Sequence, residues 1–137
     1  MVKDDCIFCK LANGVFPTNF IYEDEDFKVI LDANPATKGH SLILPKKHFK
    51  NLLDADEEIL KKALPLAKKL SNKLIEVLKC DGVNVLQNNN KAAGQVVFHL
   101  HIHLIPRYSD EKEHLISWKP NKFSDEEMKN IAESLKK

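Results

Sequence analysis

The stretch HLHIHLIP, from His99 to Pro106, alternates histidines with aliphatic residues. Because successive side chains of a β-strand point to opposite faces, this alternation predicts a strand with one histidine face and one apolar face. We expect the strand to span residues 97–105 and to end at Pro106, which lacks a backbone N–H. The aliphatic side chains would face the core and the histidines the opposite side, namely Leu100, Ile102 and Leu104 against His99, His101 and His103. Three imidazoles on one face indicate a chemical site rather than ordinary packing.

Length and charge restrict the class of protein. The 137 residues suffice for one domain, and we expect a core over about residues 6–110 and a C-terminal extension with a helix over about residues 111–137. With 21 basic and 20 acidic residues the formal charge is +1, which gives no general attraction to nucleic acid or to an anionic membrane. No apolar run is long enough to span a membrane, and the start MVKDDC lacks a signal-peptide region. Three cysteines, an odd number, then favour the cytoplasm.

The remaining patterns predict an α+β fold with a mainly antiparallel, five-stranded sheet, because the strands are grouped or joined by a hairpin rather than alternating with helices. The other expected strands are 20–22, 27–31, 40–44 and 83–87. We expect a short helix over residues 6–12, a long one over about 54–79 that Pro65 kinks or divides, and a last one over 126–135 after a capping box at Ser124. The long helix would bury Leu60, Leu64, Ala67, Leu70 (or Ser71), Leu74 and Leu78. The last helix would turn Met128, Ile131 and Leu135 inward.

The spacing of the three strand histidines limits metal binding. At about 3.4 Å per residue the Cα atoms of His99 and His103 lie about 13 Å apart, whereas zinc ligands converge to about 2.0–2.1 Å from one ion. One metal could take a single histidine or an adjacent pair, but not all three. The alternative is nucleophilic catalysis, because a neutral imidazole attacks phosphorus at neutral pH and a protonated neighbour can neutralise phosphate oxygens or protonate the leaving group.

The segment GQVVFHLHIHLIPR, from Gly94 to Arg107, resembles the signature of the histidine triad (HIT) family of nucleotidyl hydrolases and transferases. The segment LDANPATKGHSLILPKKH over residues 31–48, CIFCKLANGVFP at the start and WKP near the end also resemble the family, over roughly residues 6–120. The resemblance implies a HIT-like fold and a homodimer. It also implies cleavage at the α-phosphate of a purine nucleotide, either a nucleoside phosphoramidate or a dinucleoside polyphosphate. The reaction would pass through a nucleotidyl-histidine intermediate and require no catalytic metal.

Carried over by position, the resemblance implies roles for individual residues. His101 resembles the nucleophile, His103 the phosphate-contacting partner and His40 a fourth, supporting histidine. Residues that would hold the ribose, the phosphate and the base are Asp32, Asn88, Gly94, Gln95, Phe8, Leu11, Phe16, Ile30 and Leu31. Taken alone, Asp32 could begin a turn, Asn88 could belong to the loop, and the five apolar residues could be ordinary core.

The pair Cys6-x-x-Cys9 has three interpretations: a redox motif, two buried thiols, or half of a zinc site. A redox motif normally follows a strand, and none is expected before Cys6. In the bacterial branch that this chain resembles, such a pair holds a structural zinc together with the His of the Pro-Lys-Lys-His segment and the first strand histidine. The resemblance therefore implies a closed zinc site of Cys6, Cys9, His48 and His99.

One position departs from the family pattern. Where members often carry Ser or Thr directly after Gly-Gln, this chain has Val96, so a hydroxyl that would contact the scissile phosphate or the leaving group is absent. A second interpretation is therefore a nucleotide-binding or sensing module with weak turnover. A third is a zinc hydrolase with His101 and His103 as ligands.

Trp118 resembles an aromatic that approaches a partner subunit's site, or is a packing anchor, and His114 is expected to be solvated.

Overall fold

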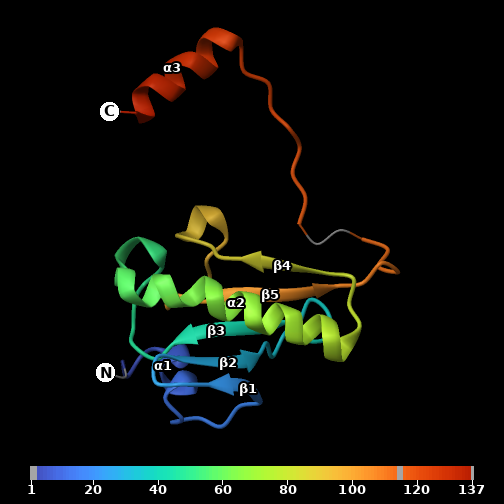
Figure 1. Ribbon diagram of the computed structural model, residues 1–137. Helices are drawn as coiled ribbons and strands as arrows, with labels where there is room; N and C mark the ends of the chain where they lie inside the picture. The colour runs from blue at the N-terminus through green and yellow to red at the C-terminus, as the bar shows by residue number, and fades with distance from the viewer. Residues whose placement is uncertain (1–2, 114–115, 137) are drawn as a thin grey trace.

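The computed structural model describes residues 3–113 and 116–136, and its centre is a five-stranded sheet (Figure 1). The strands are β1 (Phe20–Glu23), β2 (Phe27–Leu31), β3 (Ser41–Pro45), β4 (Gly82–Leu86) and β5 (Ile102–Arg107). Their order is β1-β2-β3-β5-β4, and every neighbouring pair is antiparallel. The predicted α+β class with an antiparallel, five-stranded sheet is confirmed.

The two faces of the sheet are covered by different helices because side chains alternate along each strand. Val29 of β2 packs in the cluster that contains the buried side chains of α2 (Glu57–Leu78). The next residue, Ile30, packs with Leu42, Leu44 and Ala12 of α1 (Ile7–Ala12). α1 therefore lies on the sheet face opposite α2, and this is the face that carries the candidate active site.

The long helix α2 differs from its expectation in three ways. It begins at Glu57, after the 3₁₀ turn η1 (Leu52–Asp54), and it continues through Pro65 without being divided. Its buried side chains are Ala63, Leu66, Ala67, Leu70 and Leu74. Leu64, expected in the apolar stripe, is 68% exposed. It lies about 100° around the helix from the centre of the buried set, since each residue turns the helix by about that angle.

The histidine strand is shorter at its start and longer at its end than predicted. β5 runs from Ile102 to Arg107, so His99 and His101 precede it, and Pro106 pairs with Val83 within it. Residues upstream of Ile102 leave the ladder because their hydrogen bonds go elsewhere: the Leu100 N–H donates to the carbonyl of Phe49 at 2.8 Å. Proline removes only a donor, so the strand continues beyond Pro106.

The last helix, α3 (Asp125–Leu135), has the predicted capping box between Ser124 and Glu127 but not the predicted packing. Met128, Ile131 and Leu135 are 55%, 45% and 80% exposed. Figure 1 shows the reason: an extended segment carries α3 away from the sheet. The apolar periodicity predicted a helix with an apolar face, but it contained no information about what covers that face.

Among residues 3–113 and 116–136, no helix combines the length and the apolarity needed to cross a membrane. His114 lies outside the residues that the structure describes.

Candidate active site and metal centre

A cavity of about 770 Å³ lies on the sheet face that carries α1. Its lining includes most of the residues for which the sequence predicted catalytic or nucleotide-binding roles, namely His40, His101, His103, Asp32, Asn88, Gly94, Phe8, Leu11, Ile30 and Leu31. Antiparallel pairing explains the convergence of the histidines. β3 and β5 are neighbours, so His40, directly before β3, comes close to His103 on β5.

Hydrogen bonds assign the proton positions of the three catalytic candidates. The backbone N–H of Ala36 donates to His40 Nδ1 at 3.0 Å, so the proton of a neutral His40 sits on Nε2 and is donated to His103 Nδ1 at 2.9 Å. A neutral His103 then carries its proton on Nε2. His101 Nδ1 lies 2.7 Å from the carbonyl oxygen of His99 and must donate to it. The lone pair of His101 is therefore on Nε2, the nitrogen that a nucleophile uses.

Burial keeps these imidazoles neutral at pH 7. It is the largest cause of the lowered pKa of His40 and of His101, and Asp32 opposes the shift in both. Burial, followed by the nearby His101 and His40, lowers the pKa of His103 to about 4. An uncharged His101 retains the lone pair that attack requires.

Asp32, His40 and His103 place one ligand atom each within 4.8 Å of one another, but they are poorly suited to a metal. Coordination through His40 Nε2 would require its proton to move to Nδ1, where the N–H of Ala36 already points. His101 belongs to neither of the metal-like clusters found among the described residues. This geometry favours the nucleophilic interpretation of His101 over the zinc-hydrolase one.

Of the residues predicted to hold the ribose and the base, Asp32 and Phe8 lie at the cavity but Phe16 does not. Asp32 does begin a turn, accepting the N–H of Asn34 on Oδ1 at 2.9 Å, yet its Oδ2 also lies 3.5 Å from His40 Nε2. Phe8 contacts His101 edge to face, with ring centroids 5.0 Å apart. Phe16 is not brought to the cavity, and Pro17 and Thr18 line it instead.

The loop before the histidines presents Gly94 and Val96 to the cavity but turns Gln95 away from it. Val96 is 86% exposed and Gln95 only 3%. A hydroxyl at position 96 would thus face solvent and cavity rather than the core. Sequence reasoning also missed Leu86, which lines the cavity because β4 pairs Leu86 with His103. Only the strand order reveals such a neighbour.

A second group of side chains lies beside the cavity. Cys6, Cys9, His48 and His99 place one ligand atom each within 4.8 Å of one another. Cys6 is the N-cap of α1 and Cys9 lies one turn later, so the helix turns both sulfurs the same way. His48 follows β3, and His99 is completely buried. The fold therefore brings together the four residues from three distant segments.

The distances fit a tetrahedral zinc site. Ligands at about 2.3 Å (sulfur) and 2.0–2.1 Å (nitrogen) from one zinc lie roughly 3.3–3.6 Å apart. The observed S–N separations are 3.4 Å for Cys6–His99, Cys9–His48 and Cys9–His99, and the two Nδ1 atoms are 3.2 Å apart. His99 Nε2 donates to the carbonyl of Pro45 at 2.8 Å, which leaves the Nδ1 lone pair facing the group. Burial lowers the pKa of His99 to about 4, so it is neutral, as a ligand must be.

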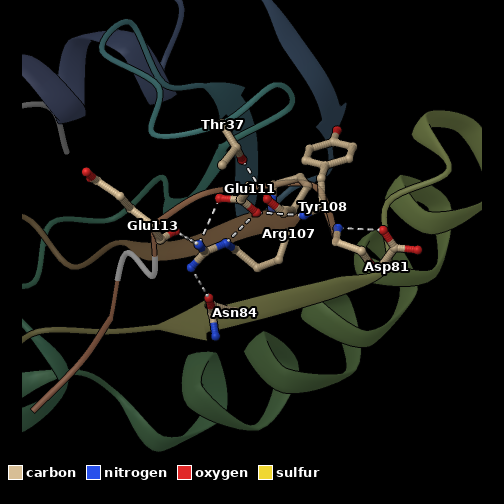
Figure 2. A network of polar contacts seen from close by, with 9 residues as sticks. Thr37, Asp81, Asn84, Arg107, Tyr108, Glu111 and Glu113 are labelled. Carbon is tan, nitrogen blue, oxygen red and sulfur yellow. Dashed lines mark hydrogen bonds and ion pairs between the residues drawn. The ribbon is translucent and has the colours of Figure 1, made fainter.

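Figure 2 shows how the segment after β5 is held. Arg107 donates to both carboxylate oxygens of Glu111, at 3.0 and 2.8 Å, and to Asn84 Oδ1 at 3.0 Å. The carboxylate of Glu111 also accepts the N–H of Tyr108 at 2.6 Å. The bond to Asn84 ties the start of this segment to β4, and Ile116, farther along the chain, lines the cavity that contains His101. Trp118 is 80% exposed and lines a neighbouring hollow of about 630 Å³.

Comparison with known proteins identifies the family. Residues 13–110 match the family model described as the HIT domain. The chain belongs to the HIT family. This HIT protein is 36% identical to Protein hit of Bacillus subtilis, over 98% of this chain and 94% of the relative. It is 40% identical to adenosine 5'-monophosphoramidase HNT1 of Saccharomyces cerevisiae, over 82% and 69% of the two chains. It is 42% identical to adenylylsulfatase HINT3 of Arabidopsis thaliana, over 77% and 54%.

Solved structures agree with the sequence relatives. A Streptococcus mutans protein superposes with a TM-score of 0.91 at 35% identity, covering 98% of this chain and 85% of that one. A zinc-bound histidine triad family protein from Mycobacterium smegmatis superposes with a TM-score of 0.76 at 34% identity, covering 96% and 94%. The expected HIT fold is confirmed.

Proposed function

We propose that this HIT protein hydrolyses purine nucleotides at the α-phosphate, with a nucleoside phosphoramidate or a dinucleoside polyphosphate as substrate. The observation that carries the proposal is the tautomer of His101. Its Nδ1–H is engaged by the His99 carbonyl, and its Nε2 lone pair lies in a cavity shared with His103 and Asp32. The names of two relatives, an adenosine 5'-monophosphoramidase and an adenylylsulfatase, support an adenosine nucleotide as the substrate class.

The reaction has two steps on this proposal. His101 Nε2 attacks the α-phosphorus, a P–N bond forms, and the bond to the amine or nucleotide leaving group breaks, with the leaving group taking a proton from solvent. The His103 Nε2–H donates to a phosphate oxygen. His40 orients His103, because the His40 Nε2–H donates to His103 Nδ1. Water then cleaves the nucleotidyl-histidine, releasing the nucleoside monophosphate and restoring neutral His101.

Mass spectrometry of the protein quenched during turnover of adenosine phosphoramidate tests the function. The proposal expects an added AMP on the peptide that contains His101. Turnover without any adduct under single-turnover conditions would contradict a covalent mechanism. Nucleotide binding without turnover would favour the second interpretation, a nucleotide-binding module.

The exposed Val96 makes that second interpretation testable. A hydroxyl donor at this position would stabilise charge on the phosphate or leaving group, and one such donor is worth up to ~10²–10³ in turnover. We expect Val96→Ser to raise kcat for adenosine phosphoramidate while the affinity for AMP stays the same, because the contact forms only as the bond breaks. Steady-state kinetics and calorimetry measure the two quantities. A variant that folds normally, by its melting temperature, but turns over no faster would show that the missing hydroxyl does not limit the enzyme.

We also propose that Cys6, Cys9, His48 and His99 hold one structural zinc. The tetrahedral spacing of the four ligand atoms and the zinc-bound relative from Mycobacterium smegmatis support this. Four protein ligands leave no open position for water, so the zinc would stabilise the fold and take no part in the chemistry. Thiolate ligands persist in a reducing compartment, which supports the cytoplasm as the location.

A homodimer is the proposed assembly, and β4 is the proposed contact strand. β4 is an edge strand, and beside it a hollow of about 420 Å³ is lined by Leu64, Ile75, Val83 and Val85, with Ser71 Oγ unpartnered among the described residues. Exposed apolar surface of this kind marks an interface.

We expect Val85→Asp to convert a dimer into a monomer by light scattering at micromolar concentration, while Val77→Asp, exposed but outside this lining, remains dimeric. A monomeric wild type would contradict the proposal.

A further inference from the structure

Two buried amides connect the segment after His48 with the loop that borders the catalytic cavity. Asn51 is 2% exposed and Gln95 is 3% exposed. Asn51 Nδ2 donates to Gln95 Oε1 at 3.2 Å and to Asn90 Oδ1 at 3.1 Å. We name the three side chains Asn51, Asn90 and Gln95 the amide bridge. Neither Asn51 nor Asn90 carried any predicted role in the sequence.

The bridge uses the full hydrogen-bonding capacity of Gln95. Its Oε1 also accepts the backbone N–H of Asn90 at 2.8 Å, and its Nε2 donates to the carbonyls of Lys50 at 2.7 Å and Val97 at 3.0 Å. Two accepted and two donated bonds leave the amide with nothing to offer a nucleotide. Gln95 therefore acts on the site through the backbone that it holds.

That backbone adopts conformations that need support. The short turn η2 (Lys91–Ala93) lies between Asn90, with φ of 74°, and Gly94, with φ of 95°. A positive φ is uncommon outside glycine and persists where surrounding contacts impose it. The bridge supplies such contacts at Asn90, through both its backbone N–H and its side chain. The cavity wall formed by Asn88, Gly94 and Val96 borders this turn on both sides.

The nucleophile depends on the same segment. His101 lies outside the strand ladder, because β5 begins at Ile102. The stretch before it is held by the carbonyl of Phe49, which accepts the Leu100 N–H at 2.8 Å, and by the Gln95 bond to Val97. Residues 49–51 therefore hold the chain on both sides of Val96 and directly before His101.

We propose that Asn51 is a positioning residue for the nucleotidyl transfer. It acts through Gln95 and Asn90. Through them it fixes the position of the cavity wall formed by Asn88, Gly94 and Val96 relative to His101. The inference rests on the proposed function. It assigns to Asn51 a contribution to the chemical step rather than to nucleotide affinity, because among the described residues no hydrogen bond of the bridge goes to Asp32 or to the apolar wall of Phe8, Leu11, Ile30 and Leu31.

Asn51→Ser tests the inference. Asn51 also caps η1 by accepting the Leu53 N–H at 2.9 Å, and serine retains that role while being too short to bridge. We expect kcat for adenosine phosphoramidate to fall roughly 10–100-fold, the size of effect that small misplacements cause. KM and the affinity for AMP should change less than about 3-fold, which separates positioning from binding. Asn72→Ser, an exposed position on α2, is the matched control and should match the wild type.

Two further measurements keep the test decisive. In a Gln95→Ala background, Asn51→Ser should lower kcat little further, because the effects of substitutions at residues that act as one unit do not add. Hydrogen exchange should become faster over residues 88–97 in Asn51→Ser and in the isosteric Asn51→Asp, but remain unchanged in β2 and β3. A wild type that does not hydrolyse the substrate would overturn the proposed function, and exchange would still decide whether the bridge holds the loop. Unchanged exchange, or a loss carried wholly by KM, would overturn the inference.

Discussion

Replacing His101 with alanine is expected to lower the turnover of adenosine phosphoramidate by more than ~10⁴-fold, because the variant has no nucleophile for the first step. The affinity for AMP should stay within about 3-fold of the wild type, because Asp32 and the apolar walls remain. Rates from single-turnover kinetics and affinities from calorimetry measure this separation of chemistry from binding.

His103→Ala is the comparison that assigns the roles. In the structure His103 is a hydrogen-bond donor to the cavity, oriented by His40, and it does not form the covalent bond on our mechanism. Its loss removes one donor to the phosphate, which costs about 10²–10³ in turnover. The AMP adduct should therefore still form in His103→Ala, only slowly, and be absent in His101→Ala. Equal residual rates in the two variants would contradict the assignment of His101 as nucleophile.

Replacing Cys9 with serine is expected to remove the zinc and to lower the free energy of unfolding by about 3–5 kcal/mol, or roughly 10–20 °C in melting temperature. The sulfur of Cys9 lies 3.4 Å from both His48 Nδ1 and His99 Nδ1, so the substitution removes a ligand that contacts both histidines of the group. Without the ion, the remaining three ligand atoms of the group lose the partner that they share. Metal analysis should find one zinc per wild-type chain and much less than one in Cys9→Ser.

Cys80→Ser is the matched control for that experiment. Cys80 is also buried, at 5% exposure, but it packs in the core against α2 and not in the metal group. Its substitution should lower stability slightly and leave the zinc content at one per chain. Wild-type protein purified without chelator and free of zinc would contradict the metal site.

Zinc removal also separates two mechanisms. If the ion is structural, chelated protein should retain its reaction for as long as it remains folded. If the zinc-hydrolase interpretation applied, chelation would abolish the chemistry with the fold intact. The proton held on His40 Nε2, facing His103, favours the first outcome.

Local sequence patterns determined the elements of this protein and much of the content of its site. Alternation and turn chemistry predicted the five strands, and the hairpin turn at Asp24 between β1 and β2 follows from a carboxylate that accepts the N–H groups of Asp26 and Phe27. The Cys6-x-x-Cys9 spacing on a single helical turn was sufficient to place two sulfurs on one side of α1. Such features depend on contacts within a few residues, so the chain alone contains them.

Tertiary structure decided what those elements do to one another. The exposed position of Leu64 and the unpacked face of α3 depend on which surface is covered, and periodicity does not contain that information. The tautomer of His101 depends on the path of the backbone before β5, and that path depends on Phe49 and Asn51, some fifty residues upstream. Gln95 belongs to a family motif, yet its amide points into the protein because it forms hydrogen bonds with the Lys50 carbonyl and the Asn51 side chain. Long-range hydrogen bonds of this kind have no local sequence signal, because each partner looks like an ordinary surface residue until the fold brings them together.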